Sequence, residues 1–202
     1  MIESILTVLV AYLIGSLSFA VMLSRLFGLP DPRGYGSGNP GATNVLRSGR
    51  KIVAALTLLG DALKGVVAVL LAKWATAQYG LADYVPAVAG LAVLLGHVWP
   101  VFFGFRGGKG VATALGLLLA LNLWLGLACA ASWLLVFAVS RVSSLSALSA
   151  AGLAPVWAWL LNAGQVETAA IAGLTGLIFW RHKTNIARLL SGDESAFNKK
   201  SG

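Results

Sequence analysis

The sequence predicts an all-α membrane protein, a polytopic bundle of seven transmembrane helices. Of its 202 residues, 58% are hydrophobic and 11% are charged, whereas a soluble domain carries about 25% charged and about 45–50% apolar residues. The hydrophobic residues form long runs that short polar or glycine- and proline-rich pieces separate. Lipid is the solvent that suits so much apolar surface, and in lipid a helix satisfies its own backbone hydrogen bonds.

The apolar runs set the expected helices. About 20 residues cross a bilayer, so five of the six runs predict single helices, the last one short. The remaining run, 111–140, is too long for one upright helix and short for two. Glu3 stands where a signal peptide carries positive charge, so we expect the first run to remain as a span. The six runs are 4–24, 52–79, 84–103, 111–140, 145–162 and 167–180.

The basic residues decide the number of spans. Thirteen of the 15 Lys and Arg residues follow the first, third, fourth and last runs, and the connections around Glu3, Asp83 and Glu167 contain none. If run 111–140 forms two helices that turn near residues 122–126, every basic loop falls on one face. We therefore predict seven spans in a single domain, 1–202, with the N-terminus outside and the C-terminus cytoplasmic. The basic residues are Arg25, Arg33, Arg47, Arg50, Lys51, Arg106, Lys109, Arg141, Arg181, Lys183, Arg188, Lys199 and Lys200.

The first basic loop is rich in glycine and in hydrogen-bond donors. Asn39 followed by Pro40 predicts a helix over about 40–48, whose free N–H groups would attract an anion. A plain glycine-rich linker is the alternative, and the density of donors argues against it. The expected phosphate-binding residues of this loop are Ser37, Gly38, Asn39, Thr43, Asn44 and Arg47.

A second glycine-rich loop lies between runs 84–103 and 111–140. Gly107, Gly108 and Gly110 allow the backbone to approach a ligand closely, and Lys109 adds a positive charge at the start of the next helix. This pattern predicts a second anion site. His97, at the end of the preceding run, is either a packed structural histidine or a participant in the site.

The third cluster follows the last run. On a helix, His182 and Asn185 share a face, and Asn185 also shares one with Arg181 and Arg188. Basic residues beside a membrane often serve only as topology anchors, but the histidine and asparagine among them favour a functional role. Arg141 and Ser144 complete the polar set expected on the cytoplasmic face.

Asp61 and Lys64 are ionisable residues within the second run. Charges at that depth are costly, so we expect them to pair with each other inside the protein. Small residues three to four positions apart, Ala11 with Gly15 and Ala172 with Gly176, predict close helix packing.

Several kinds of chemistry lack support in the sequence. Two isolated histidines without clustered carboxylates predict no metal site, and no Ser-His-Asp or Cys-His pattern predicts covalent catalysis. We expect no cofactor. The net charge of +8 would suggest nucleic acid for a soluble protein, but in a membrane protein it predicts sidedness and an anionic partner.

Together the three clusters resemble the three motifs of the bacterial acyl-phosphate:glycerol-3-phosphate acyltransferases, the PlsY family. The matching segments are Gly36-Ser-Gly-Asn-Pro-Gly-Ala-Thr-Asn44 with Arg47, the run from His97 to Thr113, and Arg181-His-x-x-Asn-Ile-x-Arg188. They occur in order across the whole chain. The sequence departs from the family's usual residues in having Val142 after Arg141 and Asp193 before Glu194.

The resemblance implies a seven-span enzyme of the bacterial inner membrane that takes its acyl group from acyl phosphate, supplied by a soluble synthase. The acyl group would pass to the sn-1 hydroxyl of glycerol 3-phosphate, which gives lysophosphatidic acid and inorganic phosphate. It implies that Ser37, Lys109, His182 and Asn185 are catalytic. Further substrate contacts are implied for Gly38, Asn39, Thr43, Asn44, Arg47, His97, Gly108, Gly110, Ser144 and Arg188.

Two questions stay open at this point. The proton of the attacking hydroxyl passes either to His182 or to a phosphate oxygen of the donor, and we favour the phosphate because no carboxylate near His182 in sequence would orient it. A transporter or channel for a small organic phosphate is the alternative function. A carrier needs its binding groups near mid-membrane, whereas these residues lie at one face.

Overall fold

The computed structural model describes residues 1–194 and 196, so two basic residues of the tail, Lys199 and Lys200, lie outside the described residues. Every regular element in the described part is a helix, which confirms the predicted all-α class. The chain forms two compact units, residues 1–122 and 123–202, and we describe each by itself.

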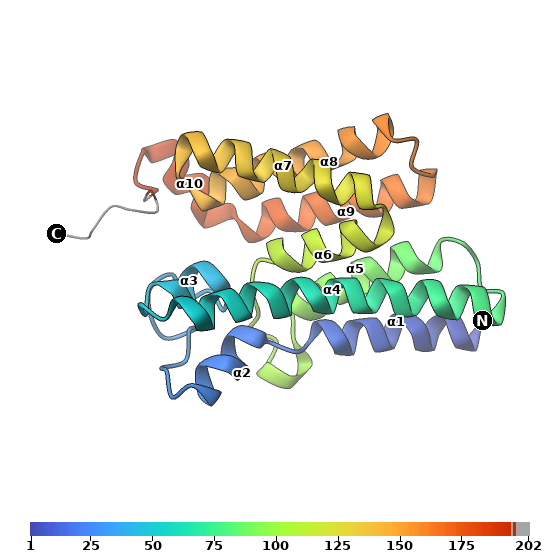
Figure 1. The fold of residues 1–202 in the computed structure, drawn as a ribbon, viewed down its shortest axis with the longest axis horizontal. Coiled ribbons are helices and arrows are strands. Elements are labelled where there is room, and N and C mark those ends of the chain that lie inside the picture. Colours follow the sequence, from blue (N-terminus) through green and yellow to red (C-terminus); the bar gives the residue numbers. More distant parts are fainter. Residues whose placement is uncertain (195, 197–202) are drawn as a thin grey trace. The chain divides into compact units, whose positions relative to one another are not determined.

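Unit 1 contains six α-helices and one short 3-10 helix (Figure 1). The long helix α4 packs against α6, α5 and α1, and α1 also packs along α5. The elements are α1 (Ile2–Gly15), α2 (Phe19–Leu26), α3 (Ala42–Leu46), α4 (Lys51–Tyr79), α5 (Val85–Val98), the 3-10 helix Val101–Phe103 and α6 (Val111–Leu121).

The first apolar run is not the single helix that we expected. It breaks between Gly15 and Phe19, and α2 is bent by 42° from α1. The break exposes the Leu17 carbonyl, which accepts a hydrogen bond of 2.7 Å from Lys64 Nζ. Ser16 Oγ accepts from the backbone N–H of Val101 at 3.3 Å. Other elements of unit 1 therefore satisfy backbone and side-chain groups at this break.

Glycines set the closest helix contacts in unit 1. A Cβ on Gly15 would collide with the Val93 carbonyl of α5, and one on Gly116 would collide with the Ala62 carbonyl of α4. Ala11, one turn before Gly15, is 1% exposed. Small residues therefore let α1 approach α5 and let α6 approach α4. The first of these contacts confirms the close packing predicted for Ala11 and Gly15.

The long apolar run 111–140 breaks at Asn122, as the sequence predicted. α6 ends at Leu121, and Asn122 has an extended backbone with φ −145° and ψ 116°. α7 begins at the next residue, which is also where the second unit begins. The break is confirmed, and a reversal of direction there stays a prediction.

Unit 2 contains the remaining helices. α8 packs against both α7 and α9, with Trp157 Nε1 donating to Ser132 Oγ at 3.1 Å and Thr175 Oγ1 donating to the Ala151 carbonyl at 2.8 Å. The prediction for Ala172 and Gly176 was wrong: both are exposed, and no described atom lies within 4 Å of a Cβ on Gly176. The elements are α7 (Leu123–Ser140), α8 (Ser143–Leu160), α9 (Gln165–Arg181) and α10 (Lys183–Ser191).

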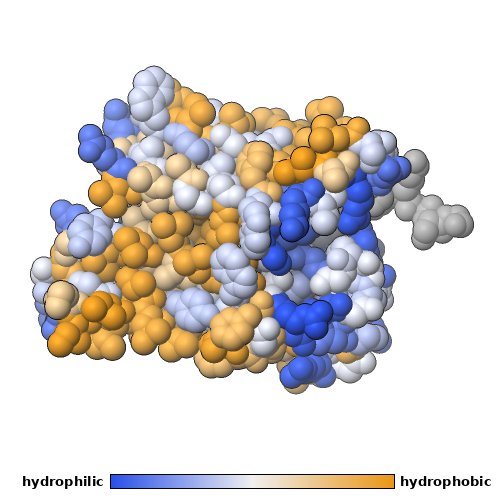
Figure 2. All heavy atoms as spheres, turned by 180° about the vertical axis from the view of Figure 1, so that it is seen from behind, coloured by the Kyte–Doolittle hydropathy of each residue, from blue (hydrophilic) through white to orange (hydrophobic). Residues whose placement is uncertain are grey.

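The longer helices carry large apolar side chains on their outer surfaces. Three segments are long and apolar enough to cross a membrane, and the bent pair α1–α2 would make a fourth. In the part of Figure 2 that shows unit 1, hydrophobic side chains cover the helices, and hydrophilic ones gather near α2 and α3. A surface of this kind suits lipid. The seven spans and the orientation of the termini stay predictions. The three segments are Lys51–Tyr79, Val85–Phe103 and Leu123–Ser140.

Candidate active site

Asn44 organises the first basic loop. Its side chain is 1% exposed, and its Nδ2 group donates to the Pro32 carbonyl at 2.7 Å and to the Tyr35 carbonyl at 3.1 Å. Its Oδ1 atom accepts from the backbone N–H of Ser37 at 3.0 Å. The amide thus closes the glycine-rich turn before α3, and the part we expected Asn44 to play toward substrate stays a prediction.

The helix in this loop is shorter than predicted. It begins at Ala42, because Gly41 takes the extended N-cap conformation and its carbonyl accepts from Val45 N–H at 3.0 Å. Asn39 is therefore not the cap, and Pro40 precedes the helix. Five residues make too short a helix to attract an anion through its dipole.

The loop instead presents individual donors. Ser37, Gly38, Thr43 and Arg47 are all exposed. A Cβ on Gly36 would lie 3.3 Å from Arg47 Cδ, so the stem of this arginine runs past the glycine that precedes Ser37. A hydroxyl, backbone N–H groups and a guanidinium are groups that bind phosphate.

The second glycine-rich loop is held against the end of α5. A Cβ on Gly107 would collide with the His97 carbonyl, and one on Gly108 would collide with His97 Nε2. Gly110 has φ +86° and caps α6, a conformation that favours glycine. These glycines are therefore required by packing and backbone geometry within unit 1. Lys109, between them, is half-buried.

The two loops of unit 1 approach each other. A Cβ on Gly108 would lie 3.1 Å from the Pro40 carbonyl, and Arg33 Nη1 donates to the Phe103 carbonyl at 3.1 Å. A structural role for Arg33 was not predicted from the sequence. Its only local signal was the nearby opposite charge of Asp31, with which it forms an ion pair of 2.7 Å.

The Asp31–Arg33 pair also shifts both pKa values. The hydrogen bond from Arg33 lowers the pKa of the Asp31 carboxyl below its usual value, against the opposing effect of partial burial. The same contact raises the pKa of Arg33. Both groups are therefore charged at neutral pH, and the guanidinium is fixed where it reaches the second loop.

Asp61 and Lys64 form the predicted buried ion pair. Lys64 Nζ lies 2.8 Å from Asp61 Oδ1, and the two side chains are 2% and 4% exposed. His97 Nδ1 lies 3.5 Å from the same carboxylate oxygen and 3.2 Å from Thr113 Oγ1. The ion pair is thus connected to His97, which precedes the second loop, and through His97 to Thr113, which follows it.

In unit 2 a carboxylate after α10 connects two helices. Glu194 Oε1 accepts from Ser144 Oγ of α8 and from Asn185 Nδ2 of α10, both at 2.6 Å. Arg188 Nε lies 3.9 Å from Glu194 Oε2. This contact of Glu194 was not predicted from the sequence. The signal in the sequence was a pair of acids, Asp193 and Glu194, after a basic helix.

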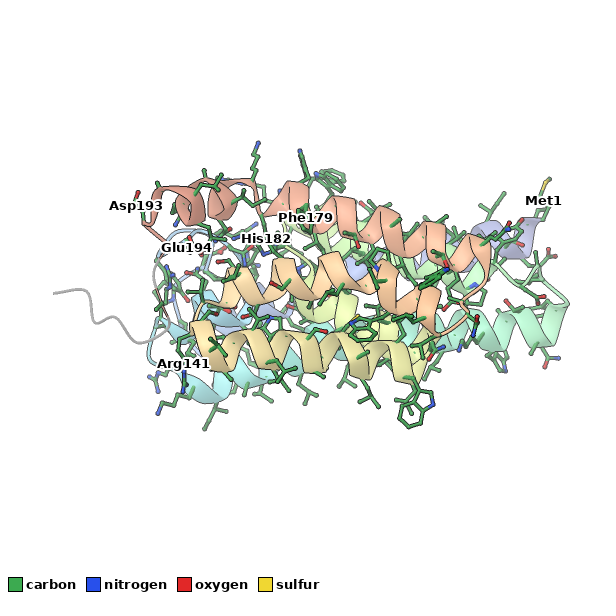
Figure 3. All side chains as sticks on the ribbon, turned by 90° about the horizontal axis from the view of Figure 1, so that it is seen from above. Met1, Arg141, Phe179, His182, Asp193 and Glu194 are labelled. Carbon is green, nitrogen blue, oxygen red and sulfur yellow. The ribbon has the colours of Figure 1, made fainter. Side chains whose placement is uncertain are left out.

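His182 lies at the junction of α9 and α10 and is 3% exposed. Its Nδ1 is 2.8 Å from the Ile178 carbonyl, so Nδ1 carries the proton and Nε2 is the nitrogen able to accept one. Figure 3 shows His182, Arg141 and Glu194 at the same end of unit 2. A backbone carbonyl therefore orients the ring in place of a carboxylate.

The site residues predicted from sequence fall into two groups, one in each unit. The apolar helices and these basic, glycine-rich loops define an α-helical membrane protein whose loops suit phosphate-bearing ligands. The family model described as glycerol-3-phosphate acyltransferase matches residues 5–192, and the chain belongs to that family. The group in unit 1 comprises Ser37, Gly38, Asn39, Thr43, Asn44, Arg47, His97, Gly108, Lys109 and Gly110, and the group in unit 2 comprises Ser144, His182, Asn185 and Arg188.

Relatives and solved structures agree with this assignment. The chain is 57% identical to the glycerol-3-phosphate acyltransferase of Thiobacillus denitrificans, over 98% of each chain. It is 55% identical to that of Chromobacterium violaceum, over 96% of this chain and 94% of the relative. The crystal structure of PlsY, an integral membrane glycerol 3-phosphate acyltransferase in its glycerol 3-phosphate form, matches with a TM-score of 0.90 at 38% identity over 96% of each chain. The lysophosphatidic acid form matches with a TM-score of 0.87 at 37% identity.

Proposed function

We propose that this protein transfers a fatty acyl group from acyl phosphate to the sn-1 hydroxyl of glycerol 3-phosphate. The products are lysophosphatidic acid and inorganic phosphate, in the first committed step of bacterial phospholipid synthesis. The observation that carries the proposal is the approach of Gly108 to the Pro40 carbonyl, since it joins the loop of Ser37 and Arg47 to the loop of Lys109. Forms of the PlsY relative with glycerol 3-phosphate and with lysophosphatidic acid support it.

The residues of unit 1 hold phosphate. Two phosphate-bearing reactants repel each other, and fixed positive charge with oriented N–H groups offsets that repulsion as charge develops on the leaving phosphate. Arg47 and Lys109 supply the charge. Ser37, Gly38 and Thr43 supply neutral donors, and Asn44 holds the turn in which Ser37 and Gly38 lie. His97, Gly108 and Gly110 shape the loop of Lys109.

Ser144, His182 and Asn185 orient the reacting hydroxyl. Asn185 and Ser144 are fixed by Glu194, and His182 by the Ile178 carbonyl. The hydroxyl oxygen forms a bond to the acyl carbon, and the bond from that carbon to the phosphate oxygen breaks. Holding the reactants in line can account for about 7–11 kcal/mol of the barrier.

The hydroxyl proton passes to an oxygen of the leaving phosphate, which departs as inorganic phosphate. His182 acts by binding and orienting, since its Nε2 accepts a hydrogen bond from the hydroxyl. His182→Gln retains a hydrogen-bonding side chain but no base, and general-base catalysis contributes about 10²- to 10⁴-fold. We expect kcat within about tenfold of wild type. A loss of several thousandfold at unchanged KM would assign the base to His182 instead.

The chain is one acyltransferase domain of the bacterial inner membrane, with seven spans, the N-terminus outside and the site on the cytoplasmic face. The polar residues of the site lie in the loops that carry the basic residues, which favours that side. A soluble acyl-phosphate synthase supplies the donor. No cofactor or metal takes part in this proposal.

The test uses the purified protein in detergent with a chelator. Acyl phosphate and glycerol 3-phosphate should yield lysophosphatidic acid and one equivalent of inorganic phosphate, while acyl-CoA as donor should yield none. Lys109→Gln should raise KM for glycerol 3-phosphate about tenfold or more, because a charge-assisted contact is lost. Lys51→Gln, an exposed lysine at the start of α4, is the matched control. Transport of a phosphate compound without product would overturn the proposal.

A further inference from the structure

Four buried polar side chains of unit 1 form a connected set under the second loop. Asp61 and Lys64 of α4 and His97 of α5 are buried, and Thr113 of α6 is fully buried. Asp61 Oδ1 lies 2.8 Å from Lys64 Nζ and 3.5 Å from His97 Nδ1. Thr113 Oγ1 lies 3.2 Å from that same ring nitrogen. The set thus joins three helices.

The opposite edge of the histidine ring contacts the loop that carries Lys109. A Cβ on Gly108 would collide with His97 Nε2 and lie 3.1 Å from His97 Cε1. The Gly108 N–H donates to the His97 carbonyl at 3.2 Å. Both the ring and the backbone of His97 therefore determine the path of the loop.

The surroundings of the ring determine which nitrogen holds its proton. Nδ1 faces a carboxylate oxygen, which can only accept a hydrogen bond, and a hydroxyl oxygen, which can donate or accept one. The carboxylate therefore favours the form of the ring in which Nδ1 carries the proton. Nε2 then faces the loop without a proton. In that state Nε2 can accept a hydrogen bond from the loop, whereas an Nε2–H group could only donate one.

We propose that Asp61 is a positioning residue for glycerol 3-phosphate, and that it acts through His97. Its carboxylate fixes the Nδ1–H form of the ring, and the ring fixes the loop that carries Lys109. This inference rests on the proposed role of that loop in binding the phosphate of glycerol 3-phosphate. Asp61 itself touches no substrate.

Lys64 has a separate part in the set. Its ammonium balances the Asp61 carboxylate and donates to the Leu17 carbonyl at 2.7 Å, at the break between α1 and α2. Removing one partner of a buried ion pair costs the most stability, because the other partner stays charged and has no counter-charge. A test of Asp61 must therefore separate its contact with His97 from the neutralisation of Lys64.

The first measurement is the tautomer of His97 by nitrogen NMR on histidine-labelled full-length protein in detergent. The chain has two histidines, so His97→Gln assigns the signals. We expect the Nδ1–H form in the wild type and loss of its predominance in Asp61→Asn. An Nε2–H ring in the wild type would overturn the inference whether or not any variant folds.

The second measurement is steady-state kinetics of Asp61→Asn and of the charge-balanced variant Asp61→Asn/Lys64→Met. We expect both to raise KM for glycerol 3-phosphate about tenfold, with KM for acyl phosphate within about twofold of wild type. Recovery of the wild-type KM in the double variant would mean that Asp61 only neutralises Lys64, and the inference would be wrong. An equal rise in both KM values would also contradict it.

The two proposals fail in different ways. If Lys109→Gln leaves KM for glycerol 3-phosphate unchanged, the proposed phosphate role of the loop is wrong, and the kinetic part of the inference falls with it. The NMR result still decides the link from Asp61 to His97, because it requires no activity. If Lys109→Gln behaves as expected and Asp61→Asn/Lys64→Met matches the wild type, only the inference fails.

Discussion

Asn44 shows how one side chain can organise a loop without being exposed to a ligand. Its amide forms three hydrogen bonds, to Pro32, Tyr35 and Ser37. The type of residue suggested a phosphate donor, because exposed asparagines donate to anions. Only its burial shows that both ends of the amide are used within the loop.

Asn44→Ala should therefore lower stability more than the neighbouring substitution Thr43→Ala. Each buried group left without its partner costs about 1–3 kcal/mol, while Thr43 is exposed. Thermal unfolding of the purified variants in detergent would measure the difference. Equal unfolding midpoints for the two variants would show that the amide does not hold the loop.

The Asp31–Arg33 pair should make stability depend on pH at the acidic end. The pKa of Asp31 is lowered in the folded state, chiefly by the hydrogen bond from Arg33. Its contribution is therefore present above the unfolded pKa, near 4, and is lost as the pH falls through the lower folded value. Because both groups are partly exposed, we expect about 1 kcal/mol or less.

Unfolding midpoints of the wild type and of Asp31→Asn should thus differ at pH 7 and converge below about pH 4. Arg33→Gln should lose the same pH-dependent part, and it also loses the contact with the Phe103 carbonyl. A difference between wild type and Asp31→Asn that persists unchanged at acid pH would contradict this account.

At the scale of the helices, close packing depends on glycines whose position in three dimensions matters more than their spacing in sequence. Gly116 of α6 faces the Ala62 carbonyl, whereas Gly176 of α9 faces open space among the described residues. Both glycines lie within apolar helices. The spacing of small residues predicted packing correctly for Gly15 and wrongly for Gly176, because spacing does not say which face meets a neighbour.

Gly116→Ala should destabilise the protein, since the added methyl group cannot fit without moving α6 away from α4. We expect about 1–3 kcal/mol, as for other overpacked sites. Gly176→Ala is the matched control, and the higher helix propensity of alanine should leave it neutral or up to about 1 kcal/mol more stable. Thermal unfolding compares them, and a harmless Gly116→Ala would contradict the packing.

At the scale of the whole molecule, the basic loops predict the orientation in the membrane. Cys129, the only cysteine, is buried and can be replaced by alanine as a background for single-cysteine variants. We expect cysteines at Asp83 and Gln165 to react with an impermeant maleimide in intact cells. Those at Ser48 and Lys183 should react only after permeabilisation.

A cysteine at Gln165 that requires permeabilisation would overturn the seven-span arrangement. The run 111–140 would then cross the membrane once, and the basic tail would lie opposite the first loop. The observed break at Asn122 is consistent with two crossings.

Much of the fold could be predicted from the sequence because its causes are local. The apolar runs, the basic loops and the break in run 111–140 depend on composition and on short spacings. The bend between α1 and α2 could not be predicted, because Lys64 meets the Leu17 carbonyl 47 residues away. The start of α3 at Ala42 was missed because the backbone of Gly41, and not the type of residue 39, sets the cap.

The sequence by itself determined that this is an apolar helical protein of the glycerol-3-phosphate acyltransferase family, because its motifs lie in short continuous segments. The tertiary structure alone decided what several of those residues do. It turned Asn44 inward, placed His97 between Asp61 and the glycine loop, and brought Glu194 to Ser144 from 50 residues away. Such contacts depend on how distant helices pack, and no spacing along the chain specifies that packing.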